Sequence, residues 1–120
     1  MANDTNTQAR ALTFSAISRD FQLITLTSVV ANLVTLYIVS IGTEAKLATS
    51  VVIISILIFA LLSGLNQMDT FKNWIDDMDD VEAKTYSGKH AKGAPFGMWK
   101  AAFSASFLAM AAAQLYNLWV

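Results

Sequence analysis

Residues 21–68 read FQLITLTSVVANLVTLYIVSIGTEAKLATSVVIISILIFALLSGLNQM, and this stretch decides the fold. It contains two uncharged runs, over 21–43 and 47–68, which are separated only by a short connection that holds Glu44 and Lys46. Each run is longer than the roughly 18–20 apolar residues that a membrane-spanning helix requires. We expect Gly42, a helix-stop residue, to end the first helix. The short connection predicts that the two helices are antiparallel neighbours.

A third uncharged run, AAFSASFLAMAAAQLYNLWV over 101–120, ends the chain. Only 14% of the 120 residues are charged, whereas an average soluble domain carries about 25%. The sequence therefore predicts an all-α integral membrane protein. We expect a polar N-terminal segment over 1–20 and a three-span membrane domain over 21–120, with transmembrane helices over about 21–42, 47–67 and 97–120 and one sizeable loop over 69–96.

The distribution of lysine and arginine predicts the orientation. With three spans, the N-terminal segment and the long loop lie on one side, and that side holds seven of the eight Lys and Arg residues. Such residues concentrate on the cytoplasmic side of membrane proteins. We therefore expect the N-terminus and the loop to be cytoplasmic and the C-terminus to lie on the opposite face. Trp99 and Trp119, about 30 Å apart along one helix, match two interfacial aromatic anchors.

The long loop begins with a helical pattern over about 69–82. Apolar residues recur there with a period of 3.6, at Phe71, Trp74, Ile75, Met78 and Val81. This pattern predicts a short amphipathic helix that continues the second span and lies in the membrane interface. Its other face is acidic and lacks a calcium-loop pattern, so we expect a solvated face, with docking of a basic partner or binding of a divalent cation as alternatives, at Asp76, Asp77, Asp79 and Asp80. The remainder, with its glycines and Pro95, is predicted to be turn-rich.

Two of the predicted spans carry patterns that favour close helix packing. Polar residues at 3-4-3 spacing form a seam on the first span, at Thr25, Ser28, Asn32 and Thr35. Small residues at a strict four-residue spacing form a row on the third span, at Ala101, Ala105, Ala109 and Ala113. Interhelical hydrogen bonds and close backbone approach drive the association of membrane helices. We expect both faces to contact protein, and the alternative for the seam is a polar permeation path.

The composition argues against several kinds of chemistry. The chain has no cysteine, and the three uncharged runs contain no histidine; proton relays and ion-coupled transporters generally need an ionisable residue within a span. A net charge of −1 disfavours nucleic-acid binding. We expect no catalytic residues, no metal site and no cofactor. Bound lipids are expected, with headgroup contacts at Lys89, Lys92 and Lys100 in and beside the basic half of the loop.

The overall plan resembles that of the small trimeric diacylglycerol and undecaprenol kinases. The resemblance consists of three spans in about 120 residues and a Ser87-Gly88-Lys89 segment before the third span. That family has two glutamates flanking an asparagine at the end of span two, whereas here Asn66 lies between Ser63 and Thr70. The resemblance therefore implies a similar arrangement of helices, and kinase activity is not carried over.

The sequence favours a non-catalytic subunit that packs into a larger multi-subunit membrane complex and stabilises it. Its partners would be other membrane subunits or copies of itself. A homo-oligomeric channel or small-solute pore is the alternative, with the polar seam lining the path. A lipid-modifying enzyme would require Asp69 or Asp76 to replace the missing acids.

Overall fold

The structure, a computed structural model, describes residues 2–120 and the side chains from residue 7 onward. Within this range the chain contains five helices and no strand: α1 (Ala2–Ile41), α2 (Lys46–Asp76), α3 (Asp80–Ala83), α4 (Tyr86–Lys92) and α5 (Phe96–Trp119). Of these, α1, α2 and α5 are long and apolar enough to cross a membrane. The predicted all-helical class and the three candidate spans are confirmed.

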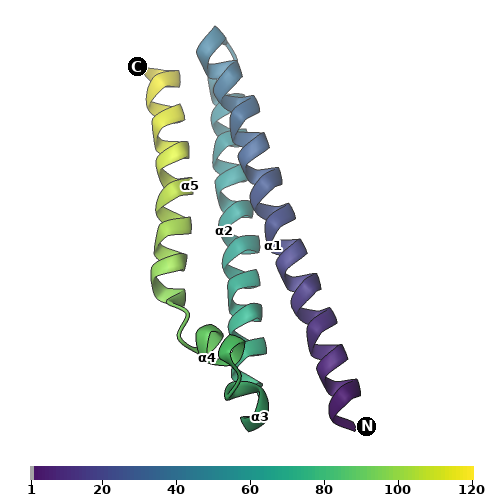
Figure 1. Ribbon diagram of the computed structural model, residues 1–120. Coiled ribbons are helices and arrows are strands. Elements are labelled where there is room, and N and C mark those ends of the chain that lie inside the picture. Colours follow the sequence, from purple (N-terminus) through teal and green to yellow (C-terminus); the bar gives the residue numbers. More distant parts are fainter. Residues whose placement is uncertain (1) are drawn as a thin grey trace.

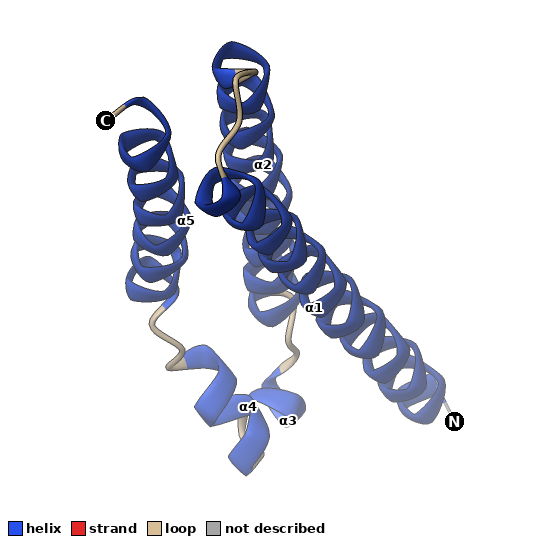
Figure 2. Cartoon of the chain, turned by 90° about the horizontal axis from the view of Figure 1, so that it is seen from above, coloured by secondary structure: helices blue, strands red, loops and turns tan. Residues whose placement is uncertain are grey.

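The three long helices form an elongated bundle of 64 × 23 × 17 Å. As Figure 1 shows, α1 and α2 form an antiparallel hairpin, and α5 runs along the other side of α2. The contact between α1 and α5 is smaller than the contact that each makes with α2. The short helices α3 and α4 lie at the end of the bundle where α5 begins (Figure 2). We call this the loop end, and the opposite end the hairpin end.

The hairpin turns at Gly42, as the sequence predicts. Gly42 has a φ of +88°, a left-handed conformation that glycine adopts without steric cost. Its N–H lies 3.1 Å from the carbonyl oxygen of Ile38 and 3.3 Å from that of Val39, so it closes the last turn of α1. This turn brings α2 back along α1 after four residues.

The hairpin is longer at the loop end than the sequence predicts. The segment over 1–20, expected to precede the first span, belongs to the same helix, because α1 is helical from Ala2. At 1.5 Å per residue, its 40 residues extend over about 60 Å, roughly twice the thickness of a bilayer hydrocarbon core. The helix persists because its first half has a partner in the C-terminal part of α2, which continues to Asp76.

The amphipathic helix expected over 69–82 as a continuation of the second span forms only in part. Its first eight residues are the last turns of α2, and the chain leaves the helix at Asp77. The predicted apolar face packs against α1, with the ring centroid of Phe14 5.6 Å from Phe71 and 5.3 Å from Trp74. The sequence predicts that this face lies in the membrane interface. In the structure it instead covers an apolar surface of α1.

The second half of the loop also differs from the turn-rich prediction, because α4 passes through Gly88. The Thr85 hydroxyl caps α4 by accepting a hydrogen bond of 3.0 Å from the Gly88 N–H. A Cβ at Gly88 would lie 2.1 Å from the carbonyl oxygen of Glu82. Glycine therefore permits close contact between α3 and α4 at this position, where the sequence predicts a break.

The apolar core follows the side of α2 that faces α5. One buried cluster lies toward the loop end and contains Ala60, Met68, Phe103 and Phe107. A second lies toward the hairpin end and contains Ile53, Ala111 and Leu118. Phe103 packs directly on the α2 backbone, because a Cβ at Gly64 would lie only 2.3 Å from its Cζ atom.

Candidate functional site

A buried polar layer joins α1 to α5 near the hairpin end. The Gln114 amide nitrogen donates a hydrogen bond of 2.9 Å to the Asn32 side-chain oxygen, and the Thr35 hydroxyl donates to the Gln114 amide oxygen. The Asn32 amide nitrogen donates in turn to the carbonyl oxygen of Ser28 at 2.9 Å. These side chains are almost inaccessible, since Asn32, Thr35 and Gln114 are 8%, 3% and 4% exposed.

This layer is part of the predicted polar seam. Asn32 and Thr35 are buried, and Ser28 is half-buried and contributes its backbone carbonyl. Thr25 forms a hydrogen bond within α1, to the carbonyl oxygen of Phe21 at 2.9 Å. In the single chain, α5 covers Asn32 and Thr35, and both side chains are hydrogen-bonded to Gln114.

Gln114 is the residue that the sequence analysis missed. The spacing of small residues dominates the third run, although Gln114 is one of its two amide side chains. An amide in a predicted span needs a hydrogen-bond partner, and the seam on the first span offers one. Pairing these two signals would have identified the contact.

A second polar contact holds α5 at the hairpin end. The Trp119 indole N–H donates a hydrogen bond of 2.8 Å to the Ser50 hydroxyl on α2. The Lys46 ammonium lies 5.8 Å from the centroid of the same indole. Together with the Gln114 contacts, these interactions fix the rotation of α5 about its own axis and its position along the axes of α1 and α2 at this end.

The predicted small-residue row lies on the outside of the bundle. Ala101, Ala105, Ala109 and Ala113 are all exposed. The residues of α5 that face the other helices are the buried ones, namely Phe103, Phe107, Ala111, Gln114 and Leu118. The row therefore makes no part of the contact between α5 and the rest of this chain.

An arginine and a tryptophan join α1 to α2 at the loop end. The Arg10 guanidinium lies 4.4 Å from the Trp74 ring centroid and donates to the Trp74 carbonyl oxygen at 2.7 Å. The Trp74 indole N–H donates to the Arg10 carbonyl oxygen at 3.2 Å. The Arg10 guanidinium also forms an ion pair with Glu82 of α3, so one residue ties three helices together.

We expect Arg10→Ala to loosen the loop end of the hairpin. The change removes the stacking and leaves the Trp74 carbonyl and the Glu82 carboxylate without this partner, a loss of about 1–3 kcal/mol. Amide hydrogen exchange over residues 7–18 is the measurement, and it should accelerate. Arg19→Ala is the matched control, because Arg19 pairs only with the adjacent Asp20 at 3.7 Å and is 71% exposed, where ion pairs contribute little. Equal exchange in the two variants would contradict this role of Arg10.

The four predicted acidic residues occupy the break between α2 and α3, and all four are exposed. Asp76 ends α2 and Asp77 follows it. Asp79 caps α3 by accepting a hydrogen bond of 2.7 Å from the Glu82 N–H, and Asp80 lies in the first turn of α3. Among the side chains that the structure describes, from residue 7 onward, no three His, Asp or Glu are grouped to hold a metal ion. The structural role visible here is helix capping.

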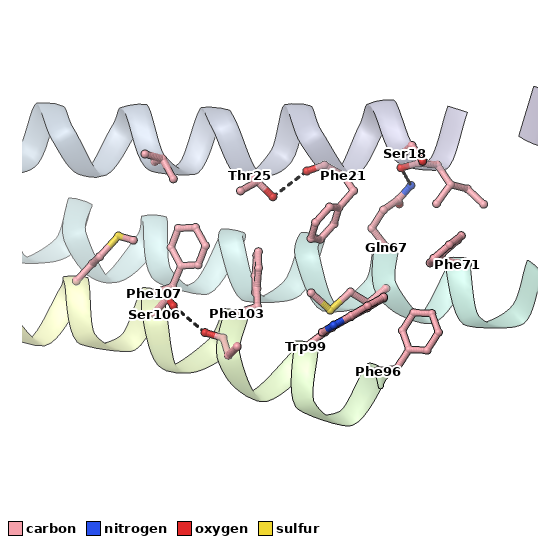
Figure 3. A pocket seen from close by; sticks show the side chains of 15 residues that line it. Ser18, Phe21, Thr25, Gln67, Phe71, Phe96, Trp99, Phe103, Ser106 and Phe107 are labelled. Carbon is pink, nitrogen blue, oxygen red and sulfur yellow. Dashed lines mark hydrogen bonds between the residues drawn. The ribbon is translucent and has the colours of Figure 1, made fainter. Parts of the chain in front are cut away.

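A groove of about 550 Å³ opens between α1 and α5 on the loop-end half of the bundle. We call it the apolar groove, and Figure 3 shows the side chains that line it. Rings from both helices enter it, with the centroid of Phe21 5.8 Å from that of Phe103 and the latter 4.8 Å from Phe107. Its polar groups include Ser18 and Gln67 toward the loop end.

A second cavity of about 820 Å³ lies under the loop, between the loop end of the hairpin and α4. We call it the loop chamber. Aromatic side chains form one wall, and charged or polar groups of the loop form another: Glu82, Thr85, Ser87, Lys89 and His90. Of the predicted headgroup contacts, Lys89 lines this chamber, Lys92 is exposed on α4, and Lys100 donates to the Asp69 carboxylate on α2.

Comparisons of the chain with protein-family models, with curated proteins and with solved structures give no match. The function is therefore argued from the residues described above.

Proposed function

We propose that this chain is a non-catalytic integral membrane subunit that packs into a larger membrane complex through the outer face of α5 and stabilises it. The observation that carries the proposal is the exposure of the alanine row at 101, 105, 109 and 113. The bundle uses the opposite face of α5 for its own packing. We further propose that the N-terminus and the loop end are cytoplasmic, because most Lys and Arg residues lie there.

The alanine row differs from the other outward faces of the bundle. The exposed residues of α1 and α2 include large apolar side chains that suit lipid, such as Leu33, Val34, Phe59 and Leu62, each more than half exposed. Four alanines at four-residue spacing instead leave a flat strip along which a second helix backbone can approach closely. In lipid, where hydrophobic burial gives no net drive, such close approach is a main source of helix association.

The polar groups of the bundle support a structural role. Asn32, Thr35 and Gln114 satisfy one another, and Trp119 binds Ser50. The uncharged runs supply no acid or base, so a proton-transfer step within them has no obvious donor or acceptor. These polar contacts hold three helices in register, which is what a subunit needs to present a fixed face.

Leucine substitutions in the alanine row should weaken assembly. Ala105→Leu or Ala109→Leu places three additional heavy atoms where helix backbones would nearly touch, and overpacking of this kind costs about 1–3 kcal/mol. Co-purification of partners after extraction in a mild detergent measures the effect, with membrane insertion checked separately. Insertion should be unchanged, because leucine is favourable in hydrocarbon.

Leu108→Ala is the matched control, because Leu108 is half-exposed and lies one position from the row. We expect it to retain its partners at equal expression. If both leucine variants assemble like the parent, or if the parent runs alone as a monomer, the proposal fails. If the captured partner is a second copy of this chain, the complex is a homo-oligomer built on this face.

A further inference from the structure

We infer that the apolar groove and the loop chamber form one binding site for an anionic phospholipid. An acyl chain would occupy the groove between α1 and α5, and the phosphate would lie beside Lys89 and His90 in the chamber. The inference rests on three observations. The two cavities share lining residues, and the lining becomes more polar from the groove toward the loop chamber. The chamber also holds a positive charge that no carboxylate of the described residues neutralises.

The two cavities share lining residues. Phe71 of α2 and Trp99 of α5 line both of them. Phe96 connects this pair, because its ring centroid is 5.6 Å from Phe71 and 5.2 Å from Trp99. A row of three aromatic rings therefore marks the junction, and an elongated molecule can pass along it from one cavity to the other.

The groove has the polarity of a hydrocarbon site. The part of the groove away from the loop end is lined by Val29, Phe107 and Met110, which lie within the uncharged runs. The polar lining residues Ser18 and Gln67 lie at the loop end (Figure 3). In a bilayer this opening faces lipid, and an apolar cavity of this kind does not hold water. Its contents are then hydrocarbon, and its open side gives an acyl chain direct entry from the membrane.

The loop chamber suits an anionic headgroup. Its one carboxylate, Glu82, is already paired with Arg10. Lys89 also lines the chamber and makes no ion pair with any described residue, and His90 lies beside it. The uncompensated charge is therefore positive, which attracts a phosphodiester. The aromatic residues Phe14, Trp74 and Tyr86 also line the chamber, and they suit the glycerol and upper acyl region, where aromatic side chains concentrate.

Native mass spectrometry of the full chain in mild detergent tests the site. Dioleoylphosphatidylglycerol and dioleoylphosphatidylcholine are titrated separately, and soluble glycerol 3-phosphate serves as a headgroup without chains. We expect the anionic lipid to bind several-fold more tightly than the zwitterionic lipid, and glycerol 3-phosphate to leave no adduct. Lys89→Gln should lower the affinity for the anionic lipid about fivefold, the effect of one basic residue near a lipid surface.

Ser106→Phe tests the groove, because Ser106 lines it and its side chain is exposed. The added ring fills the space and should weaken the binding of both lipids. Two controls should leave binding unchanged: Lys92→Gln, at an exposed lysine of α4 outside the chamber lining, and Leu108→Phe, at an exposed position of α5 outside the groove.

Three outcomes would overturn the inference. Equal affinity for the two lipids, unaffected by Lys89→Gln, means that the chamber does not recognise the phosphate. Unchanged binding in Ser106→Phe, with circular dichroism showing an intact helical fold, means that the groove holds no acyl chain. Binding of glycerol 3-phosphate as strong as that of the lipid means a site for soluble anions. None of these results bears on the alanine row, so lipid binding and assembly fail or succeed separately.

Discussion

Gly64→Ala should destabilise the bundle by about 1–3 kcal/mol, the usual cost of overpacking a close helix contact. The new Cβ would lie 2.3 Å from Cζ and 2.5 Å from one Cε of Phe103. Phe103 is buried and already contacts Phe21 and Phe107, so its ring moves only by pushing into the apolar groove or by separating α5 from α2. Thermal or denaturant unfolding in detergent micelles measures the loss.

Gly97→Ala is the control for this substitution, because Gly97 is also helical and a Cβ there meets nothing within 4 Å. Alanine at such a position is neutral or stabilises by about 0.4–1 kcal/mol. A second test combines Gly64→Ala with Phe103→Leu, which removes the clashing ring. The cost of Gly64→Ala should then shrink, and a cost that is the same in both backgrounds would show that the ring contact is not its cause.

Gln114→Leu should cost about 1–3 kcal/mol, because it leaves the buried Asn32 amide oxygen and Thr35 hydroxyl without their partner on α5. The Gln114 side chain contacts both groups, and the Thr35 hydroxyl also lies 3.0 Å from the backbone carbonyl oxygen of Asn32. Asn117→Leu is the matched control, since Asn117 is exposed on the same helix less than one turn away. Unfolding in micelles is again the measurement, and Asn117→Leu should be neutral or slightly stabilising.

A double substitution separates a hydrogen bond from simple packing at this layer. Asn32→Leu combined with Gln114→Leu removes both amides, and replacing both partners of a buried hydrogen bond by apolar groups is often nearly neutral. We therefore expect the double variant to be less destabilised than the sum of the single variants. Additive losses would contradict a direct interaction between Asn32 and Gln114.

The parts of the fold that the sequence predicts are those encoded by local signals. Uncharged runs give the three candidate spans, and Gly42 ends the first because only its backbone conformation is needed there. The length of α1 before residue 21 was missed because it depends on contacts between residues 64 positions apart, such as Arg10 and Trp74. The surroundings of Phe71 would be equally apolar in the membrane interface or against a neighbouring helix. The periodicity of apolar residues does not distinguish these two positions.

The sequence also predicts some features of the candidate site and misses others. The seam and the alanine row are recognisable by spacing, but their directions are not: the seam faces inward toward Gln114, and the row faces outward. At Gly88 the sequence predicts a break in the helix, and the structure has a helix there. Glycine usually interrupts a helix, yet here it allows α4 to touch the Glu82 carbonyl, a close approach that only the three-dimensional arrangement reveals.

The buried polar layer also constrains how the protein is made. Thr35 and Asn32 find their partner on a residue 79 and 82 positions later in the chain, respectively. During synthesis, the hairpin of α1 and α2 is complete before Gln114 has been added. Until α5 packs against the hairpin, the side-chain oxygen of Asn32 and the hydroxyl of Thr35 therefore lack their partner Gln114, and the docking of α5 closes this polar patch.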